Sequence, residues 1–342
     1  HMPSARGHDR LELVTRNTAE VLTLDELKAS LDGKTGLSAY YGTAPTGPVH
    51  LGYFVPLGKI FDFKEAGIDT KILLADVHAS MDDQKTRWEQ HEAKVEYYRK
   101  CIELALPWKG KPEFVIGSSY QFDRKYVFDV WRAASIITEK RAMRAASEVT
   151  RMKDTKVSEL IYPIMQALDE QYLDVDIQLG GLDQRHVFAL ARDLHPMLGY
   201  KSRMEIMTPV ILSLRGDGKK MSASEPQGHI KIYDSEEAIR KKMDGANCPV
   251  GEVKANPVLE LARYIVFPTL GRLEINRDDK YGGDVSFASY QELESAFADK
   301  KLHPMDLKKA LASSLADMLK PAREYFSSNM DMLKRLGPEF MP

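Results

Sequence analysis

The stretch LSAYYGTAPTGPVHLGY, residues 37–53, decides the fold class of this chain. It predicts a short strand over residues 37–42, a loop rich in glycine and proline, and a helix that begins at His50. The segment TKILLAD, residues 70–76, follows with the nearly continuous apolar character of a strand buried in a parallel sheet. A strand, a helix and a strand in this order form a βαβ unit, so we predict an α/β fold with a Rossmann-like parallel sheet.

The alternation of strands and helices continues to about residue 230 and then stops. Further strands are predicted at residues 112–116, 175–179 and 206–212. Two long helical patterns, over residues 124–150 and 158–173, indicate a helical insertion at about 124–173. Later helical segments are predicted at residues 235–245, 256–267, 290–299 and 304–336. We therefore expect two domains, a parallel-sheet domain over 1–230 and a mostly α-helical domain over 231–342.

The composition excludes several classes of protein. The chain has 342 residues, 43% of them hydrophobic, and its 48 basic residues nearly balance its 50 acidic ones. A polyanionic partner must therefore be met by local basic patches, because the chain has no overall positive field. Cys101 and Cys248 do not make a disulfide framework or a zinc site, so we expect no metal site and a reducing, cytoplasmic setting. Apolar runs stay well short of the roughly 18 residues of a membrane span, so no membrane association is expected.

The loop and helix start at residues 43–53 form the first candidate site. Ligands of open α/β sheets bind beyond the carboxyl ends of the strands, and a helix N-terminus favours anions. Gly47 and Gly52 allow the backbone to come close to a ligand, and His50 suits donation to a phosphate oxygen. The segment does not match the dinucleotide or P-loop glycine patterns. The alternative is that His50 only caps the helix or packs within it.

The second candidate is the loop over residues 216–224, which ends in the sequence KMSAS. Its glycines indicate mobility, and Lys219, Lys220, Ser222 and Ser224 offer hydrogen-bond donors suited to pyrophosphate. Taken alone, the segment also fits a solvated surface loop. Its occurrence together with the first candidate, in this order and spacing, favours a nucleotide whose phosphates are held from two sides.

The helix predicted at residues 158–173 contains a third candidate. Tyr162, Gln166 and Asp169 lie at positions i, i+4 and i+7, so they share one face of the helix. A phenol, an amide and a carboxylate beside an apolar stripe suit a small polar ligand, although a solvated polar edge is the commoner use of such a face.

The segment QLGGLDQR, residues 178–185, is a fourth candidate, because a strand ends there in two glycines. Asp183 suits either a ribose hydroxyl or the N-cap of the next helix. Tyr40, on the first strand, points towards the same crevice if the sheet is parallel. His78, which follows the strand at 70–76, either orients a ligand or is structural.

These segments together resemble the signatures of a known family. The motifs PTGPVHLGY, LIYPIMQALDEQYL, QLGGLDQRH, KMSAS, KYGGD and LHPMDLK are similar to those of class I aminoacyl-tRNA synthetases, and specifically of the tyrosyl-tRNA synthetases of the archaeal and eukaryotic cytoplasmic type. The resemblance runs from about residue 9 to the end of the chain. It implies a ligase that activates L-tyrosine with ATP and transfers it to the 3′-terminal adenosine of tRNA(Tyr) in translation. It also implies a catalytic domain over 1–230 and an anticodon-binding domain over 231–342.

The resemblance assigns a role to each candidate residue. Tyr40 and Asp169 are expected at the phenol hydroxyl of tyrosine, and Tyr162, Gln166 and Gln184 at its ammonium group. The residues expected to bind ATP are Thr43, Ala44, His50, Gly52, Gly180, Asp183 and Lys220. Those expected to carry catalysis are His50, Gly52, Lys220, Ser222 and Ser224, the last three around the leaving pyrophosphate. Mg²⁺ is expected to arrive bound with ATP, and no prosthetic group is expected.

The resemblance also implies macromolecular partners. Arg185 would help to read the first acceptor-stem pair of the tRNA, Tyr281 would stack on the anticodon, and Asp306 would read its first base, a guanine. The family forms homodimers whose tRNA spans both subunits, and we expect a dimer here. Trp131, Ile136 and Ile137 make the insertion the expected interface between the subunits.

One departure from the family pattern and several rival functions need to be weighed. Ala223 stands where the KMSKS signature has its second lysine, so another cation, or Lys219, would have to compensate. The rivals are a tryptophanyl-tRNA synthetase, a small-molecule nucleotidyltransferase and a non-catalytic tRNA-binding relative. The pair Tyr40 and Asp169 favours a phenol over an indole. The helical domain with Tyr281 argues against the nucleotidyltransferase, and the presence of the motif residues argues against loss of activity.

Overall fold

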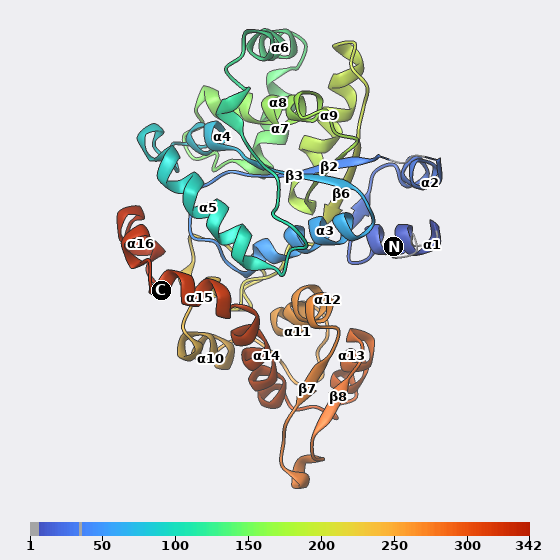
Figure 1. Cartoon of the computed structure of the whole chain (residues 1–342), viewed down its shortest axis with the longest axis vertical. Helices are drawn as coiled ribbons and strands as arrows, with labels where there is room; N and C mark the ends of the chain where they lie inside the picture. The colour runs from blue at the N-terminus through green and yellow to red at the C-terminus, as the bar shows by residue number, and fades with distance from the viewer. Residues whose placement is uncertain (1–6, 34–35) are drawn as a thin grey trace. The chain divides into compact units, whose positions relative to one another are not determined.

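The computed structural model describes residues 7–33 and 36–342 and has an α/β fold with a helical C-terminal region (Figure 1). The chain divides into two compact units. Unit 1 contains the described residues up to Thr46, Lys59–Arg99 and Trp108–Pro209, and unit 2 contains Gly47–Gly58, Lys100–Pro107 and Val210–Pro342. Helices α3 (Phe54–Glu65) and α5 (His91–Ala105) contribute residues to both units.

In the described part of unit 1, six strands form one sheet in the order β1-β6-β5-β2-β3-β4. The strands are β1 (Glu20–Val21), β2 (Ser38–Thr43), β3 (Asp69–Leu74), β4 (Phe114–Ile116), β5 (Ile177–Gly181) and β6 (Met204–Thr208). All neighbours run parallel except β1, which pairs antiparallel with β6 and was not predicted. The Rossmann-like parallel sheet predicted from the sequence is confirmed. Its register places Tyr40 opposite Gln178 of the neighbouring strand β5.

The helices of unit 1 differ from the prediction in the insertion and at His50, and the helix Asp76–Met81 was not predicted. They are α1 (Gly7–Thr15), α2 (Leu24–Gly33), α4 (Asp76–Met81), α6 (Arg124–Ala134), α7 (Glu139–Val149), α8 (Val157–Tyr172) and α9 (Arg185–Met197), besides α3 and α5. The single helix predicted over 124–150 is wrong, because α6 ends at Ala134 and a new helix, α7, starts after Thr138, whose side chain caps it by accepting a hydrogen bond from the Arg141 N–H at 3.2 Å. The helix predicted to begin at His50 starts with a 3₁₀ turn, Leu51–Tyr53, and becomes α-helical only at Phe54.

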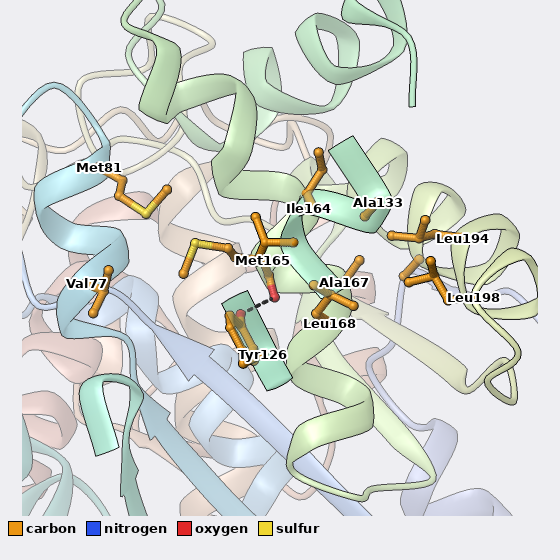
Figure 2. Close-up of a cluster of buried hydrophobic side chains, with 12 residues drawn as sticks. Val77, Met81, Tyr126, Ala133, Ile164, Met165, Ala167, Leu168, Leu194 and Leu198 are labelled. Carbon is orange, nitrogen blue, oxygen red and sulfur yellow. Dashed lines mark hydrogen bonds between the residues drawn. The ribbon is translucent and has the colours of Figure 1, made fainter. Parts of the chain in front are cut away.

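Helix α8 is held in place by a buried apolar cluster, which is drawn in Figure 2. Ile164, Met165 and Leu168 of α8 pack there with side chains from α4, α6 and α9. The Tyr126 hydroxyl of α6 also lies within hydrogen-bonding distance of the Met165 carbonyl of α8, at 3.0 Å (Figure 2). Burial of this stripe fixes the rotation of α8, and therefore the direction of the polar side chains on its adjacent face.

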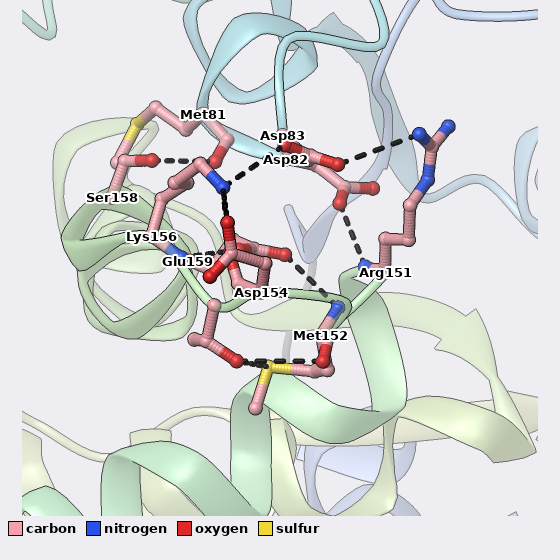
Figure 3. A network of polar contacts seen from close by, with 10 residues as sticks. Met81, Asp82, Asp83, Arg151, Met152, Asp154, Lys156, Ser158 and Glu159 are labelled. Atoms are coloured by element: carbon pink, nitrogen blue, oxygen red, sulfur yellow. Dashed lines mark hydrogen bonds and ion pairs between the residues drawn. The ribbon is translucent and has the colours of Figure 1, made fainter.

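A polar network fixes the start of α8 and joins it to the segment after α4 (Figure 3). The buried Glu159 carboxylate accepts from the backbone N–H groups of Met152 at 3.0 Å and Lys156 at 2.7 Å. The Asp82 carboxylate accepts from the Arg151 N–H at 2.7 Å, and the Ser158 hydroxyl donates to the Met81 carbonyl at 2.7 Å (Figure 3). Side-chain carboxylates thus accept from the backbone N–H groups of the segment that precedes α8. These hydrogen bonds anchor the first turn of the helix.

Helix α9 contains a buried histidine that makes a testable contribution to acid stability. The His195 Nε2–H donates to the Ala167 carbonyl at 2.8 Å, and within the described residues its Nδ1 has no hydrogen-bond partner. Burial is the main cause that lowers the pKa of His195 to about 4, with the charge of Arg203 acting in the same direction. The unfolded chain therefore binds a proton at higher pH than the folded chain, and stability is lost as pH falls from about 6.5 to about 4.

We expect the His195→Gln variant to lose less stability on acidification than the parent protein. Glutamine can keep the donor to Ala167 but does not titrate. The free energy of unfolding, measured with urea at pH 7 and pH 4.5, should fall by about 2 kcal/mol less in the variant. Equal losses in the two proteins would show that His195 does not contribute to acid lability.

The C-terminal part of unit 2 is mostly helical, as expected, but it also contains a hairpin. Its helices are α10 (Glu236–Asp244), α11 (Pro257–Leu261), α12 (Phe267–Leu270), α13 (Tyr290–Ala298), α14 (Pro304–Met318), α15 (Lys320–Ser327) and α16 (Met330–Leu336). Strands β7 (Leu273–Ile275) and β8 (Val285–Phe287) pair antiparallel and were not predicted. The segment predicted as helical over 304–336 is three helices, which Leu319 and Asn329 separate.

Candidate active site

A buried carboxylate and its donors form the centre of the candidate site in unit 1. The carboxylate of Asp169 on α8 accepts hydrogen bonds from the hydroxyls of Tyr120 at 2.8 Å and Tyr126 at 2.9 Å, both to Oδ1. The Gln121 side-chain amide donates to Oδ1 at 3.1 Å and to Oδ2 at 3.3 Å. Burial raises the pKa of Asp169 to about 7, against the opposing effect of these donors. Since most of the bonds converge on Oδ1, Oδ2 retains capacity to accept a further donor.

Tyr40 lies close to this carboxylate, as expected of a pair that reads a hydroxyl group. Its side chain is buried on β2, and its hydroxyl donates to the Gln166 carbonyl of α8 in a long contact of 3.4 Å. Burial raises the pKa of Tyr40 well above its ordinary value, and the charge of Asp169 contributes to the shift. Tyr40 is therefore a neutral phenol at physiological pH, able to donate to or accept from a ligand.

Three residues around Asp169 were missed in the sequence analysis. Tyr120 and Gln121 follow the 3₁₀ turn Gly117–Ser119 that comes after β4, and Tyr126 lies on α6. The first two lie beyond the carboxyl end of a strand, as His78 and Asp183 do. Ligands of open α/β sheets bind at such strand ends, so the strand predicted at 112–116 could have pointed to these two residues. Tyr126 offers no comparable signal, because its link to Asp169 depends on how α6 packs against α8.

The other two side chains on this face of α8 also have polar or aromatic partners. The Gln166 side-chain amide donates to Oε1 of Gln184 at 2.8 Å and to Oε1 of Gln178 at 3.2 Å. The ring of Tyr162 meets the ring of His78 edge to face, at 4.4 Å between centroids. Burial lowers the pKa of His78 to about 4, so this imidazole is neutral. The face of α8 is thus turned into unit 1, and a solvated polar edge is excluded as its description.

The remaining candidates of unit 1 lie at the ends of β2 and β5. Thr43 ends β2, is buried, and accepts from the Ala75 N–H at 2.9 Å; Ala44 is the residue after it. A Cβ added to Gly180 of β5 would lie 2.6 Å from the ring of Phe188, so packing alone requires glycine there. Asp183 lies within the 3₁₀ turn Leu182–Gln184 and is not the N-cap of α9, which removes the alternative considered for it.

Arg185, expected to read the acceptor stem, opens α9 in an ion pair. Its guanidinium donates to both carboxylate oxygens of Glu20, from Nε at 2.8 Å and from Nη2 at 3.2 Å. The side chains of Arg185 and Glu20 are 53% and 32% exposed, and an ion pair that solvent reaches contributes little to stability. The fork geometry holds the arginine in one orientation at the surface.

His50 belongs to unit 2, where it caps the turn that precedes α3. Its Nδ1 accepts from the Gly52 N–H at 3.0 Å, so Nε2 carries the proton in the neutral ring. Burial lowers the pKa of His50 to about 3, and the nearby charge of Lys220 adds to the shift. A Cβ on Gly52 would lie 2.7 Å from His50 Cε1, which explains the need for glycine. His50 does cap the turn, and the capping bond orients its Nε2–H as a donor.

The KMSAS loop contacts the PTGPVHLGY segment within unit 2, so these two candidates come together. A Cβ on Gly47 would lie 2.7 Å from the Cβ of Ala223. His229, which the sequence analysis missed, donates from Nδ1 to the Ser222 carbonyl at 2.8 Å and stacks on His50 at 5.5 Å between ring centroids. The hydroxyls of Ser222 and Ser224 share a hydrogen bond of 2.8 Å. The two motifs, far apart in the sequence, are therefore in contact in the folded chain.

The two residues expected to meet the anticodon lie on separate elements of unit 2. Tyr281 ends the 3₁₀ turn Asp279–Tyr281 between β7 and β8, and its side chain is 62% exposed, with the Lys280 ammonium 4.8 Å from its ring centre. Asp306 lies in the first turn of α14, which His303 caps. An exposed aromatic ring with a cation over it suits stacking on a base.

The described residues offer neither a metal cluster nor a membrane-spanning helix. They contain no cluster of three or more His, Cys, Asp or Glu side chains arranged to hold a metal ion. None of their helices has the length and apolar character needed to cross a membrane.

Comparison with known proteins identifies the family. Residues 33–320 match the family described as tRNA synthetases class I (W and Y). The tyrosine–tRNA ligase of Methanopyrus kandleri is 44% identical over 321 residues, which are 94% of this chain and 98% of the relative. The cytoplasmic tyrosine–tRNA ligase of Danio rerio is 41% identical over 98% of this chain, which spans 63% of that relative.

A solved structure agrees with these sequence relatives. The tyrosyl-tRNA synthetase of Archaeoglobus fulgidus, complexed with L-tyrosine, superposes with a TM-score of 0.89 at 40% identity, covering 97% of this chain and 100% of that one. The family description includes both tryptophanyl and tyrosyl enzymes, but the two sequence relatives and this structure are tyrosyl enzymes. With a parallel sheet, a buried carboxylate ringed by phenols, and the PTGPVHLGY and KMSAS segments in contact, this chain belongs to the tyrosine–tRNA ligase family of class I aminoacyl-tRNA synthetases.

Proposed function

We propose that unit 1 binds the side chain and ammonium group of L-tyrosine along one face of α8. The observation that carries the proposal is the buried Asp169 carboxylate at one end of this face and the Gln166 amide nearer the other. Asp169 and Tyr40 read the phenol hydroxyl, while Tyr162, Gln166 and Gln184 receive the ammonium group. With a rise of about 1.5 Å per residue, Tyr162 and Asp169 are roughly 10 Å apart along the helix, a span that suits a small aromatic amino acid.

ATP is the second substrate, with Mg²⁺ bound to its phosphates. The nucleoside is bound by residues at or just beyond the carboxyl ends of β2 and β5, namely Thr43, Ala44, Gly180 and Asp183. The phosphates are bound by His50, Gly52 and Lys220. The tyrosine carboxylate attacks the α-phosphorus, the bond to the pyrophosphate oxygen breaks, and tyrosyl-adenylate forms. The Nε2–H of neutral His50 and the ammonium of Lys220 stabilise the charge that develops on the phosphate oxygens, while Ser222 and Ser224 hold the leaving pyrophosphate. The magnesium ion neutralises part of the phosphate charge.

Tyrosine-dependent exchange between ATP and pyrophosphate is the experiment that tests this proposal. Exchange with tyrosine, and much weaker exchange with tryptophan or phenylalanine, is the expected result, because a hydroxyl is needed to satisfy Asp169 and Tyr40. Tryptophan-dependent exchange would identify the rival synthetase. Absence of exchange with every amino acid, from folded protein with Mg²⁺, would favour the non-catalytic relative and make Ala223 the first position to question.

We propose that residues 1–230 form the catalytic domain and residues 231–342 the anticodon-binding domain. After activation, the tyrosyl group moves to the 3′-terminal adenosine of tRNA(Tyr), with Arg185 at the acceptor stem and Tyr281 and Asp306 at the anticodon. The name of the zebrafish relative supports a cytoplasmic location.

Replacing Tyr281 should separate tRNA recognition from amino-acid activation. We expect Tyr281→Ala to lower kcat/KM for tRNA aminoacylation by roughly 10- to 100-fold, because a stacked base contributes about 1–3 kcal/mol. Pyrophosphate exchange, which needs no tRNA, should stay unchanged. Tyr281→Phe keeps the aromatic face and is the matched control. If the alanine variant aminoacylates normally, Tyr281 does not stack on the anticodon.

Helix α6 supports the proposal of a homodimer through the insertion over 124–173. Phe128 and Trp131 expose 62% and 61% of their side chains, and Ile136 after the helix is also exposed. Apolar groups gathered in this way mark interaction surfaces. Ile137, expected beside them, instead packs against the core of unit 1.

We expect Trp131→Glu to convert a dimer into a monomer in sedimentation velocity at micromolar concentration, because a charge would have to be buried in the interface. Leu270→Glu, at an exposed apolar position of α12, is the control and should leave the dimer intact. A parent protein that sediments as a monomer would contradict the proposed dimer. A Trp131→Glu variant that remains dimeric would exclude α6 from the interface.

A further inference from the structure

A line of buried polar side chains leads away from the proposed ammonium-binding residues into the core of unit 1. Gln166 donates from Nε2 to Gln184 and Gln178, and Gln178 in turn donates from Nε2 to Oε2 of Glu170 at 2.7 Å. Gln178 on β5, Glu170 on α8 and Glu205 on β6 are at most 1% exposed. The tyrosine site itself gives no reason for two carboxyl groups at this depth.

Glu205 lies opposite Gln178 in the register of β5 and β6, and the Gln178 amide contacts Glu170, so the two carboxyl groups are neighbours that interact with each other. Within the described residues, Oε1 of Glu170 and Oε1 of Glu205 are both buried without a hydrogen-bond partner. Two adjacent buried carboxylates do not both ionise, because neither desolvation nor mutual repulsion allows it. One proton held between the two groups would satisfy an oxygen of each.

The surroundings show which group holds the proton. Burial raises the pKa of both groups, and the negative charge of Glu170 raises that of Glu205 further. Arg192 Nη1 lies 3.4 Å from Oε2 of Glu205 and partly opposes this rise in the pKa of Glu205, while the charges of Arg203 and Arg192 favour ionised Glu170. His195 Nε2 is 3.9 Å from Glu170 but is engaged with the Ala167 carbonyl and stays neutral. Glu205 therefore holds the proton and donates it to ionised Glu170.

An ionised Glu170 fixes the direction of every hydrogen bond in the line. A carboxylate only accepts, so Gln178 must turn its NH₂ group towards Glu170 and its oxygen towards Gln166. Gln166 must then direct its NH₂ group at Gln178 and Gln184. Its Oε1 is the atom left for a ligand, and an amide oxygen is what an ammonium group requires.

We propose that Glu170 and Glu205 share one proton and, through Gln178, orient the Gln166 amide so that its oxygen faces the ammonium group of tyrosine. The inference rests on the tyrosine site proposed above and extends it by three positioning residues that do not touch the substrate. It makes the pair of carboxyl groups a determinant of selectivity for an amino acid with a protonated amine.

Each single glutamine variant should leave the KM for tyrosine almost unchanged. In Glu205→Gln, the new amide offers its oxygen to Arg192 and its NH₂ group to Glu170, as the protonated carboxyl does. In Glu170→Gln, the new amide accepts from Gln178 and donates to Glu205, which is then ionised. Both variants retain one charge and one donor between the two positions, so we expect the KM for tyrosine to change by no more than about threefold in either variant.

The double variant Glu170→Gln/Glu205→Gln should behave differently. Arg192 still requires an oxygen at position 205, so the NH₂ group there must face position 170. The amide at position 170 then donates to Gln178, and Gln178 donates its NH₂ group to the Gln166 oxygen. The Gln166 oxygen is no longer available to the substrate, and the Gln166 NH₂ group faces the substrate ammonium instead.

The test is pyrophosphate exchange with the parent protein, the two single variants and the double variant. We expect the double variant to raise the KM for tyrosine by roughly 10- to 100-fold, with the KM for ATP unchanged and kcat little changed, a non-additive result for neighbouring groups. Inhibition by 3-(4-hydroxyphenyl)propionate, which has the phenol but no ammonium group, should stay within about twofold of the parent value. A general loss of packing would weaken both ligands.

Several outcomes would overturn the proposal. Either single variant losing as much tyrosine affinity as the double variant would exclude the shared proton, and a double variant with normal tyrosine KM would exclude the orienting role. If the double variant does not fold, Gln178→Met, which cuts the line, should raise the tyrosine KM by a similar factor, and a normal KM there would also overturn the proposal. If the parent protein shows no tyrosine-dependent exchange, the proposed function itself is refuted. That result is known before any variant is compared, so the two failures can be told apart.

Discussion

Replacing Lys220 with alanine is expected to lower the rate of tyrosyl-adenylate formation by about 100- to 1,000-fold and to leave the affinity for tyrosine unchanged. The magnitude is that of removing one preorganised donor from developing charge in a transition state. Within unit 2, the positive charge of Lys220 already acts on His50, whose pKa it helps to lower. Lys220 thus lies near the group proposed to donate to phosphate, while the proposed tyrosine site is built from residues of unit 1.

The measurement is single-turnover formation of adenylate together with equilibrium binding of tyrosine. Lys219→Ala is the matched control, because Lys219 is the neighbouring lysine and lies 3.8 Å from the Glu225 carboxylate. We expect a loss of less than about fivefold there, in line with a surface charge. A loss as large as that in Lys220→Ala would show that Lys219 compensates for Ala223. Equal losses of rate and tyrosine affinity in Lys220→Ala would refute the assignment of Lys220 to pyrophosphate.

Replacing Asp169 with alanine is expected to lower the preference for tyrosine over phenylalanine by roughly 10- to 100-fold. A hydrogen bond to a charged group contributes about 1.5–3 kcal/mol, and the parent enzyme loses it when phenylalanine leaves the carboxylate without a partner. Tyrosyl-tRNA synthetases are themselves the standard example of such discrimination without editing, so its existence in the family is known. What the structure adds is the set of three donors that hold this carboxylate in place.

The ratio of kcat/KM for the two amino acids in pyrophosphate exchange checks this prediction. Tyr126→Phe removes one donor to Oδ1 and keeps the carboxylate, so it should preserve most of the preference. Because Asp169→Ala leaves three buried donors without an acceptor, its thermal unfolding must be measured beside Asp169→Asn, which keeps the shape of the side chain. Unchanged discrimination in both folded variants would remove Asp169 from the role.

The strands were predictable because their signal is local. Buried parallel strands read as continuous apolar runs, and β3 and β5 were found within about two residues of their ends. Strand β1 and the hairpin β7–β8 are only two or three residues long, too short for a period to show. The break between α6 and α7 was missed because a single hydroxyl, that of Thr138, begins a new helix within an otherwise continuous helical pattern.

The candidate site divides in the same way between local and distant interactions. The amino-acid sequence by itself determined the parallel α/β fold, the shared face of Tyr162, Gln166 and Asp169, and the order of the PTGPVHLGY and KMSAS motifs. The first two depend on helix or strand periodicity, which acts over a few residues, and the third is read directly from the residues. They are accordingly the features that a reader of the sequence can derive.

Only the tertiary structure decided which groups surround those residues. The donors to Asp169 lie 43 to 49 residues away from it in the chain, and His229 reaches Ser222 and His50 only once the loop is folded. The proton that we propose Glu170 and Glu205 share likewise depends on the pairing of β5 with β6 and on the contact of Gln178 with α8. Partners at such separations are chosen by packing and by the need to satisfy buried polar groups, and neither leaves a periodic signal in the sequence.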